Sequence, residues 1–202
     1  MTFREFRHLV AMDQQALTRL GSGHGLLIRL MFNFDTQVTF FFRLCSYLKS
    51  KKSRAFGLYY PVLMLYRHIM YKTGIQLPPG TPVGGGLAFT HYGSIIVNSG
   101  CVMGEDVLII ADVTIGSVRT DHGSLIPRIG RRVVLGAGAK LIGGVTVGDN
   151  VCIGAGSVVV KDVPDNAVVA GNPAKVINLN GAEVVARYLG ADTKSEIREK
   201  LS

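Results

Sequence analysis

Apolar residues recur every six positions through the middle of the chain. One run comprises Val83, Phe89, Ile95, Cys101, Val107 and Val113, and a second comprises Ile129, Leu135, Leu141, Val147, Ile153 and Val159. A six-residue period with an aliphatic residue and a small neighbour is typical of a parallel β-helix, in which three such units complete one triangular coil. We therefore predict that residues 74–177 form a left-handed parallel β-helix, in which Leu135 stacks on Ile153.

The period is broken once. Ile115 and Ile129 are 14 positions apart, which is not a multiple of six, so residues 117–128 must loop out of the coil. The loop carries Arg119, Asp121 and His122, which suit a hydroxyl-bearing or anionic ligand. A solvated loop without a ligand is the alternative.

The flanking segments have helical patterns. We expect an α-helical domain over residues 1–73, with helices at 37–49 (capped by Asp35 and Thr36) and 55–71, and a break at 21–23. No stretch reaches the roughly 18 uninterrupted apolar residues of a membrane-spanning helix. Residues 178–202 predict a C-terminal tail of one or two short amphipathic helices.

Charge is concentrated at the N-terminal end. Residues 1–76 hold eleven Lys and Arg residues against three acidic ones, whereas the remainder is neutral. This segment either packs its apolar face on neighbouring elements or lies on an anionic inner leaflet through a basic, aromatic-rich surface. No recognised motif accompanies the charge, so we expect no nucleic-acid partner.

Cysteine usage and the N-terminus bear on the compartment. Cys45, Cys101 and Cys152 are far apart and show no CxxC spacing, which argues against a disulfide framework or a zinc site. The opening MTFREFRHLV lacks the layout of a signal peptide. We expect a cytoplasmic protein without a metal, with peripheral contact at the inner face of the membrane through residues 1–73 as an addition to test.

The repeats also resemble a known family. The stretch TGIQLPPGTPVGGGLAFTHYGSIIVNSG and the closing DVPDNAVVAGNPAKVI are similar to the hexapeptide-repeat acyltransferases, in the serine acetyltransferase-like branch. Within it, the chain looks closest to short O-acetyltransferases of polysaccharide biosynthesis. The resemblance implies a homotrimer, with a dimer of trimers as a further option, whose interfaces bind acetyl-CoA and an acceptor. Exposed flat faces of a single prism independently favour closed assembly.

The resemblance also implies site residues. His91 in FTHYG falls where the family has its catalytic histidine, so it would act as general base on the acceptor hydroxyl. Thr90 and Tyr92 beside it, and Arg119, Asp121 and His122 in the loop, would bind the acceptor. The small residues of LGAGAK and IGAGSV would let the pantetheine of acetyl-CoA lie against the backbone, and two lysines would bind its phosphates; these cofactor positions are Gly136, Ala137, Gly138, Ala155, Gly156, Lys140 and Lys161.

Three positions depart from the serine acetyltransferase pattern. Gln76 and Thr90 stand where the family has aspartates, and Leu125 stands where it has an arginine for the serine carboxylate. We therefore expect an O-acetyltransferase that acts on a sugar hydroxyl of a polysaccharide, nucleotide sugar or lipid-linked precursor. Serine O-acetyltransferase is the alternative within the enzyme class, and a non-catalytic β-helix scaffold is the alternative outside it.

Overall fold

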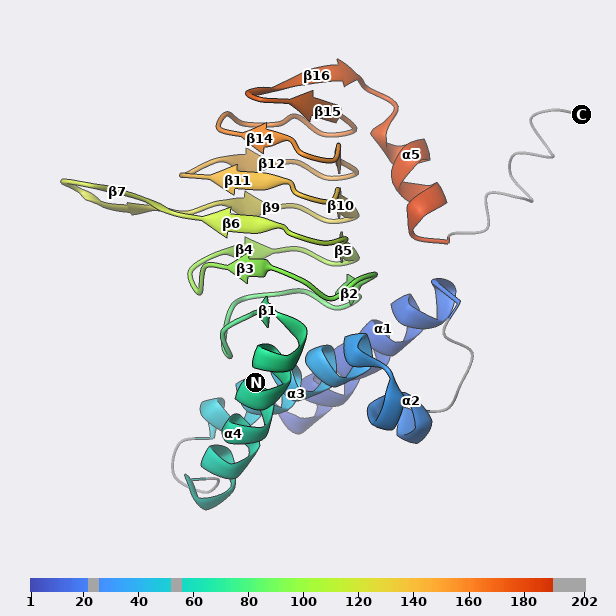
Figure 1. The fold of residues 1–202 in the computed structure, drawn as a ribbon, viewed down its shortest axis with the longest axis vertical. Helices are drawn as coiled ribbons and strands as arrows, with labels where there is room; N and C mark the ends of the chain where they lie inside the picture. Colours follow the sequence, from blue (N-terminus) through green and yellow to red (C-terminus); the bar gives the residue numbers. More distant parts are fainter. Residues whose placement is uncertain (22–25, 52–55, 191–202) are drawn as a thin grey trace, which may run out of the picture.

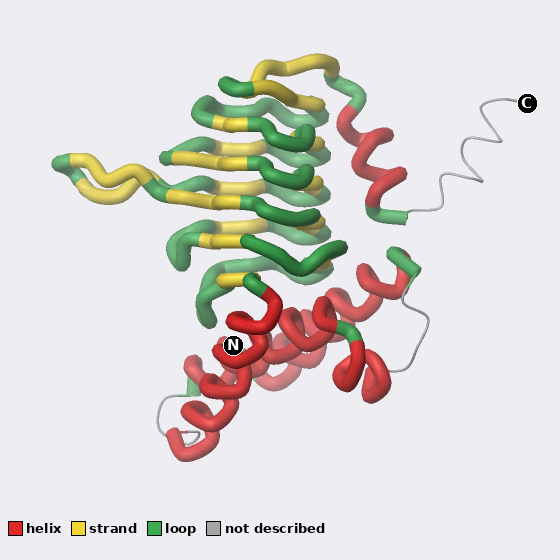
Figure 2. The backbone as a smooth tube through the Cα atoms, in the orientation of Figure 1, coloured by secondary structure: helices red, strands yellow, loops and turns green. Residues whose placement is uncertain are grey.

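Helices at one end support a stack of β-coils (Figure 1). The structure is a computed structural model that describes residues 1–21, 26–51 and 56–190. The helices are α1 (Phe3–Arg19), α2 (Leu26–Phe32), α3 (Phe34–Ser50) and α4 (Phe56–Thr73), with α5 (Gly181–Tyr188) after the β-helix. The predicted fold class, a left-handed parallel β-helix with N-terminal helices and a short C-terminal helix, is confirmed (Figure 2).

The predicted helix boundaries need small corrections. α3 begins at Phe34, with Asn33 as the N-cap residue, so the expected cap at Asp35 and Thr36 lies inside the first turn. α4 continues two residues beyond the predicted end at Tyr71. Ala55, part of the break at 21–23 and residues 191–202 of the tail lie outside the described residues. Among the helices that the structure describes, none combines the length and hydrophobicity needed to cross a bilayer.

Three parallel faces make up the prism, and each is named here by its first strand. The β1 face holds β1 (Ile75–Gln76), β3 (Ile95–Val97), β6 (Thr114–Gly116), β11 (Lys140–Ile142) and β14 (Val158–Val159). The β2 face holds β2 (Ala88–Phe89), β5 (Val107–Ile109), β10 (Val133–Leu135), β13 (Cys152–Ile153), β15 (Val168–Gly171) and the antiparallel β16 (Ala174–Asn178). The β4 face holds β4 (Val102–Met103), β9 (Arg128–Ile129) and β12 (Thr146–Val147).

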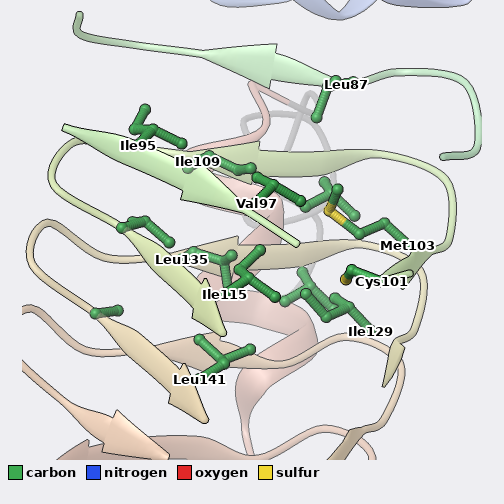
Figure 3. Packing of buried hydrophobic residues seen from close by; sticks show 14 of the residues in the cluster. Leu87, Ile95, Val97, Cys101, Met103, Ile109, Ile115, Ile129, Leu135 and Leu141 are labelled. Atoms are coloured by element: carbon green, nitrogen blue, oxygen red, sulfur yellow. The ribbon is translucent and has the colours of Figure 1, made fainter. Parts of the chain in front are cut away.

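Apolar side chains at two positions of each six-residue unit point inward and fill the prism (Figure 3), and each of these two positions is called here a row. Leu135 pairs with Ile153 on the neighbouring coil, as predicted. However, the predicted positions do not all belong to the same row. The residues from Ile95 to Val113 belong to one row, and those from Ile129 to Val159 belong to the other. The period survives this mixing because both rows repeat every six residues. Of the twelve predicted positions, all but the partly buried Val83 are buried.

Two insertions change the length of the coils. Phe89 pairs with Ile109 while Ile96 pairs with Thr114, so the turn between β2 and β3 is two residues longer than the turn above it. The second insertion is the predicted loop, which forms an antiparallel hairpin of β7 (Val118–Thr120) and β8 (Gly123–Leu125). The hairpin projects away from the prism (Figure 1).

A buried ion pair joins the helices to the first coil. The Arg43 guanidinium on α3 donates to both carboxylate oxygens of Asp13 on α1, at 2.8 and 3.0 Å. Asp13 Oδ1 also accepts from the backbone amides of Gly86 and Leu87, and Arg43 donates to the Val83 carbonyl at 2.7 Å. These contacts fix α1 and α3 against the segment that leads into β2.

Only part of the prism exterior is covered by its own chain. On the β2 face, the outward side chains of Leu108 and Val134 are 1% exposed, because they pack with α1 and α5 residues such as Leu17 and Val185. On the β1 face, the outward side chain of Ile96 is 43% exposed. The β1 face therefore remains available for contact with another molecule.

Candidate functional site

The lengthened turn between β2 and β3 carries His91. Its five residues, 90–94, begin with the Thr90 amide donating to the Ile109 carbonyl, and Gly93 then takes a φ of 146°. The Gly93 amide donates to the Thr73 carbonyl at the end of α4, at 2.9 Å. The extra residues push His91 outward, so that the imidazole is exposed and faces solvent in the single chain.

The residues beside His91 have unequal surroundings. The Thr90 hydroxyl is buried and makes no hydrogen bond within the described part of the chain. The Tyr92 side chain is 69% exposed, and its ring meets Phe34 edge-on at 5.4 Å between centroids. Both residues therefore flank His91 within the turn, but only Tyr92 presents its side chain to a ligand in solution.

The predicted cofactor turns lie on the same edge of the prism as His91. This edge, called here the His91 edge, consists of the turns that lead from the β2 face to the β1 face: 90–94, 110–113, 136–139 and 154–157. Backbone hydrogen bonds link consecutive turns, since the Gly138 amide donates to Ala111 and the Gly156 amide donates to Ala137. The upper three turns thus form a hydrogen-bonded column, and the 90–94 turn with His91 lies next below them on the same edge.

The small residues of this column have two different roles. Gly136 is buried, and a Cβ there would lie 2.6 Å from the Ile153 carbonyl oxygen, so coil stacking itself requires glycine. Gly138 and Gly156 adopt φ values of 73° and 67°, in the left-handed region that favours glycine. A Cβ on Gly156 would meet nothing within 4 Å, and Ala137 and Ala155 are exposed. These outer positions leave room along the backbone for an extended ligand.

The lysines and the hairpin residues occupy other places. Lys140 begins β11 directly after the 136–139 turn, so it lies beside the column and is exposed. Lys161 follows β14 and lies on the opposite edge of the β1 face. Arg119 is on β7, and Asp121 and His122 form the exposed hairpin tip, also on that opposite edge. Within one chain, the β1 face therefore separates the hairpin from His91.

The sequence reasoning missed Asp112. This exposed residue lies in the 110–113 turn, one coil above His91, with a φ of 52°. It places a carboxylate on the His91 edge between the histidine and the cofactor turns. The sequence pattern could have pointed to Asp112, because this aspartate takes the place that Gly138 and Gly156 hold in the next two turns.

No metal cluster accompanies these residues. Within the described ranges, the structure contains no group of three His, Cys, Asp or Glu side chains that is placed to hold a metal ion. The arrangement instead offers an exposed imidazole at one end of a column of open backbone. That combination suits proton transfer next to an extended ligand.

Comparisons with known proteins show which transferases the chain is similar to. Residues 126–161 match the family described as bacterial transferase hexapeptide (six repeats). The chain is 38% identical over 112 residues to a serine acetyltransferase of Synechococcus elongatus, a match that covers 55% of this chain and 46% of that protein. It is 41% identical over 105 residues to a serine acetyltransferase of Helicobacter pylori, covering 52% of this chain and 61% of that protein. The chain thus matches only about half to three fifths of these relatives' length.

Solved structures of serine acetyltransferases also superpose on the chain. The crystal structure of serine acetyltransferase from Brucella abortus strain S19 superposes with a TM-score of 0.73 at 28% identity, covering 89% of this chain and 72% of that chain. A serine acetyltransferase complex with CoA superposes with a TM-score of 0.71 at 28% identity, covering 87% of this chain and 71% of that chain.

These findings correct the predicted acceptor. The expectation of a sugar acceptor is contradicted by relatives that are named serine acetyltransferases, and these relatives do not support a closer likeness to polysaccharide O-acetyltransferases. The departures at Gln76, Thr90 and Leu125 were therefore weak evidence against serine. Arg119 lies on the facing strand of the same hairpin, paired with Ser124, so the hairpin still carries a guanidinium. Residues 126–161 carry the bacterial transferase hexapeptide repeat, and the relatives described above, which match about half of the chain, are named serine acetyltransferases.

Proposed function

We propose that the protein is an acetyl-CoA-dependent O-acetyltransferase whose acceptor is serine. The observation that carries the proposal is the His91 edge, where an exposed imidazole begins a column of small residues that ends at Gly156. Acetyl-CoA lies along this column with its pantetheine against Ala137, Gly138 and Ala155. Its thioester then reaches the end of the column near His91.

His91 acts as the general base. A neutral imidazole accepts the proton of the serine hydroxyl as that oxygen attacks the thioester carbonyl, and CoA leaves as the thiol. A backbone amide of a neighbouring coil stabilises the negative charge that develops on the carbonyl oxygen. Thr90 and Tyr92 border the acceptor, and Lys140 lies where it can meet a phosphate of CoA.

The active assembly is a homotrimer. His91 and the hairpin lie on opposite edges of the β1 face, so a second chain packed on this face brings its hairpin toward the first chain's His91. Arg119, Asp121 and His122 then complete the acceptor site from the neighbouring subunit. Sedimentation equilibrium tests this proposal, with an expected mass three times the chain mass of 21.7 kDa.

Acetyl transfer is tested by release of free CoA from acetyl-CoA in the presence of serine. The wild type is expected to turn over, and His91→Ala is expected to lose about 10²-fold or more in kcat, as for removal of a general base. His68→Ala is the matched control, because His68 is exposed on α4 away from the His91 edge. An inactive wild type, or a His91→Ala variant with wild-type turnover, would overturn the proposal.

A further inference from the structure

A hollow lies where the helices meet the first coil, below the His91 turn. Its volume is about 620 Å³, within the range of about 300–1,000 Å³ that is usual for small-molecule sites. Its walls come from α3, α4 and the segment that includes and follows β1. Neither the hairpin nor the column of small residues contributes to it.

The charged side chains that line the hollow are basic. Lys49 on α3 and Arg67 on α4 line it, and the described lining includes no Asp or Glu. The Lys49 ammonium donates to the Pro79 carbonyl at 3.0 Å, which holds the end of this long side chain in place. The hollow therefore favours an anion, since two positive charges face it without a lining carboxylate to neutralise them.

The rest of the lining is largely apolar or aromatic. Tyr59, Tyr71 and Met70 on α4, together with Pro78 and Pro79, supply ring and thioether surfaces. A small inorganic anion would leave these surfaces uncovered, whereas a neutral apolar molecule would leave the two cations without a partner. The complementary ligand has an anionic group attached to an apolar or aromatic body.

We propose that this hollow is a second ligand site, which binds a phosphate monoester carried on an apolar or aromatic body. Lysine and arginine both bind phosphate oxygens through charge-assisted hydrogen bonds, and arginine does so with two donors at once. The site is distinct from the His91 edge, although the two are neighbours. Gly74 belongs to the lining, and the preceding residue, Thr73, accepts the hydrogen bond from Gly93 in the His91 turn.

Isothermal titration of the full chain with phenyl phosphate tests the proposal. We expect saturable binding at one site per chain, with weaker binding of phenol and of inorganic phosphate. Arg67→Gln and Lys49→Gln should each weaken phenyl phosphate binding about tenfold, the effect of losing one charge-assisted hydrogen bond. Lys72→Gln is the matched control, because it removes the same charge from an exposed position on α4 outside the hollow.

The variants also separate this site from the proposed acetyl-transfer site. His91→Ala should bind phenyl phosphate as the wild type does, and Arg67→Lys should recover part of the affinity lost in Arg67→Gln. Absence of saturable binding, equal weakening by Lys72→Gln, or loss of binding in His91→Ala would overturn the proposal. None of these results depends on turnover with serine, so failure of the proposed function would be seen separately.

A soluble phosphate ester and a lipid headgroup share this chemistry. Co-sedimentation with phosphatidylcholine vesicles, with and without phosphatidic acid, distinguishes the two sources. Sedimentation that requires phosphatidic acid and is lost in Arg67→Gln identifies a lipid headgroup. Binding of phenyl phosphate without such sedimentation identifies a soluble ligand.

Discussion

The ion pair between Asp13 and Arg43 is predicted to be the strongest single link between the helices and the β-helix. The two side chains are 1% and 3% exposed, so neither charge has water as an alternative partner. In Asp13→Ala, the guanidinium of Arg43 loses both carboxylate contacts, and the amides of Gly86 and Leu87 lose their acceptor. The chain would then bury an uncompensated charge and two unpaired donors.

Removing one partner of a buried ion pair typically costs about 3–5 kcal/mol of folding free energy. We expect Asp13→Ala to fall in this range, with Arg43 keeping its hydrogen bonds to the Val83 and Gly84 carbonyls. Replacing both charges, as in Asp13→Leu with Arg43→Met, should cost less than the single substitution, because no buried charge is then left alone. This ordering distinguishes an ionic effect from a loss of packing.

Urea unfolding at one fixed chain concentration measures these differences. Glu183→Ala is the control, because it breaks an exposed ion pair, in which Glu183 is 51% and Arg187 is 60% exposed. This substitution is expected to cost about 0.5 kcal/mol of folding free energy or less. Hydrogen exchange should show the loss of protection first in α1, α3 and residues 83–87. A cost for Asp13→Ala below about 1 kcal/mol, or a double variant that is worse than the single, would refute the reasoning.

Three further predictions follow from the site and the core. Gly156→Ala should raise the KM for acetyl-CoA several-fold, because the added Cβ would project into the open side of the column. Gly21→Ala is the control, since Gly21 also has a positive φ and nothing within 4 Å of an added Cβ. This variant should lose stability without a change in the KM for acetyl-CoA. Burial raises the pKa of the Cys45 and Cys101 thiols to about 12, so neither should react with a disulfide reagent at pH 8 until the chain unfolds; rapid reaction of the native protein would contradict this. Hydrogen bonds from the Arg131 amide and guanidinium hold the pKa of Asp149 below its ordinary value of 3.8. Their contribution to folding stability is therefore present above pH 3.8, and it is lost as the pH falls through the lower pKa of the folded state. The urea midpoints of wild type and Asp149→Asn should therefore converge on acidification from pH 6, and a gap independent of pH would count against the ion pair.

The β-helix could be predicted because its local rule is strict. Each strand places apolar side chains inward in the same register, so the six-residue period appears directly in the sequence, and the 14-residue gap between Ile115 and Ile129 locates the hairpin. The assignment of positions to rows could not be made from the period, because the two inward rows repeat with the same spacing. Only the pairing of Phe89 with Ile109 and of Ile96 with Thr114 reveals the extra residues of the His91 turn.

The buried ion pair was not predicted, for a different reason. In the sequence, Asp13 and Arg43 contributed only to the charge balance of residues 1–76, and charged residues are seldom buried. Their partnership depends on a contact across 30 positions and on backbone groups of a third segment, residues 83–87. Neither the helical period nor the charge balance contains that information.

The acceptor was mispredicted from three departures from the family pattern, at Gln76, Thr90 and Leu125. Leu125 was compared with an arginine at the same place in the chain, but the hairpin presents both of its strands to whatever lies beside it. Val118 pairs with Leu125 and Arg119 with Ser124, so a cation and an aliphatic side chain sit on adjacent rungs. In the proposed trimer, this hairpin faces the His91 turn of a neighbouring chain, and the acceptor meets the combined surface of two subunits. For the proposed serine acceptor, the packing of the β1 face decides which side chain meets its carboxylate, and Arg119 has the charge that this role requires.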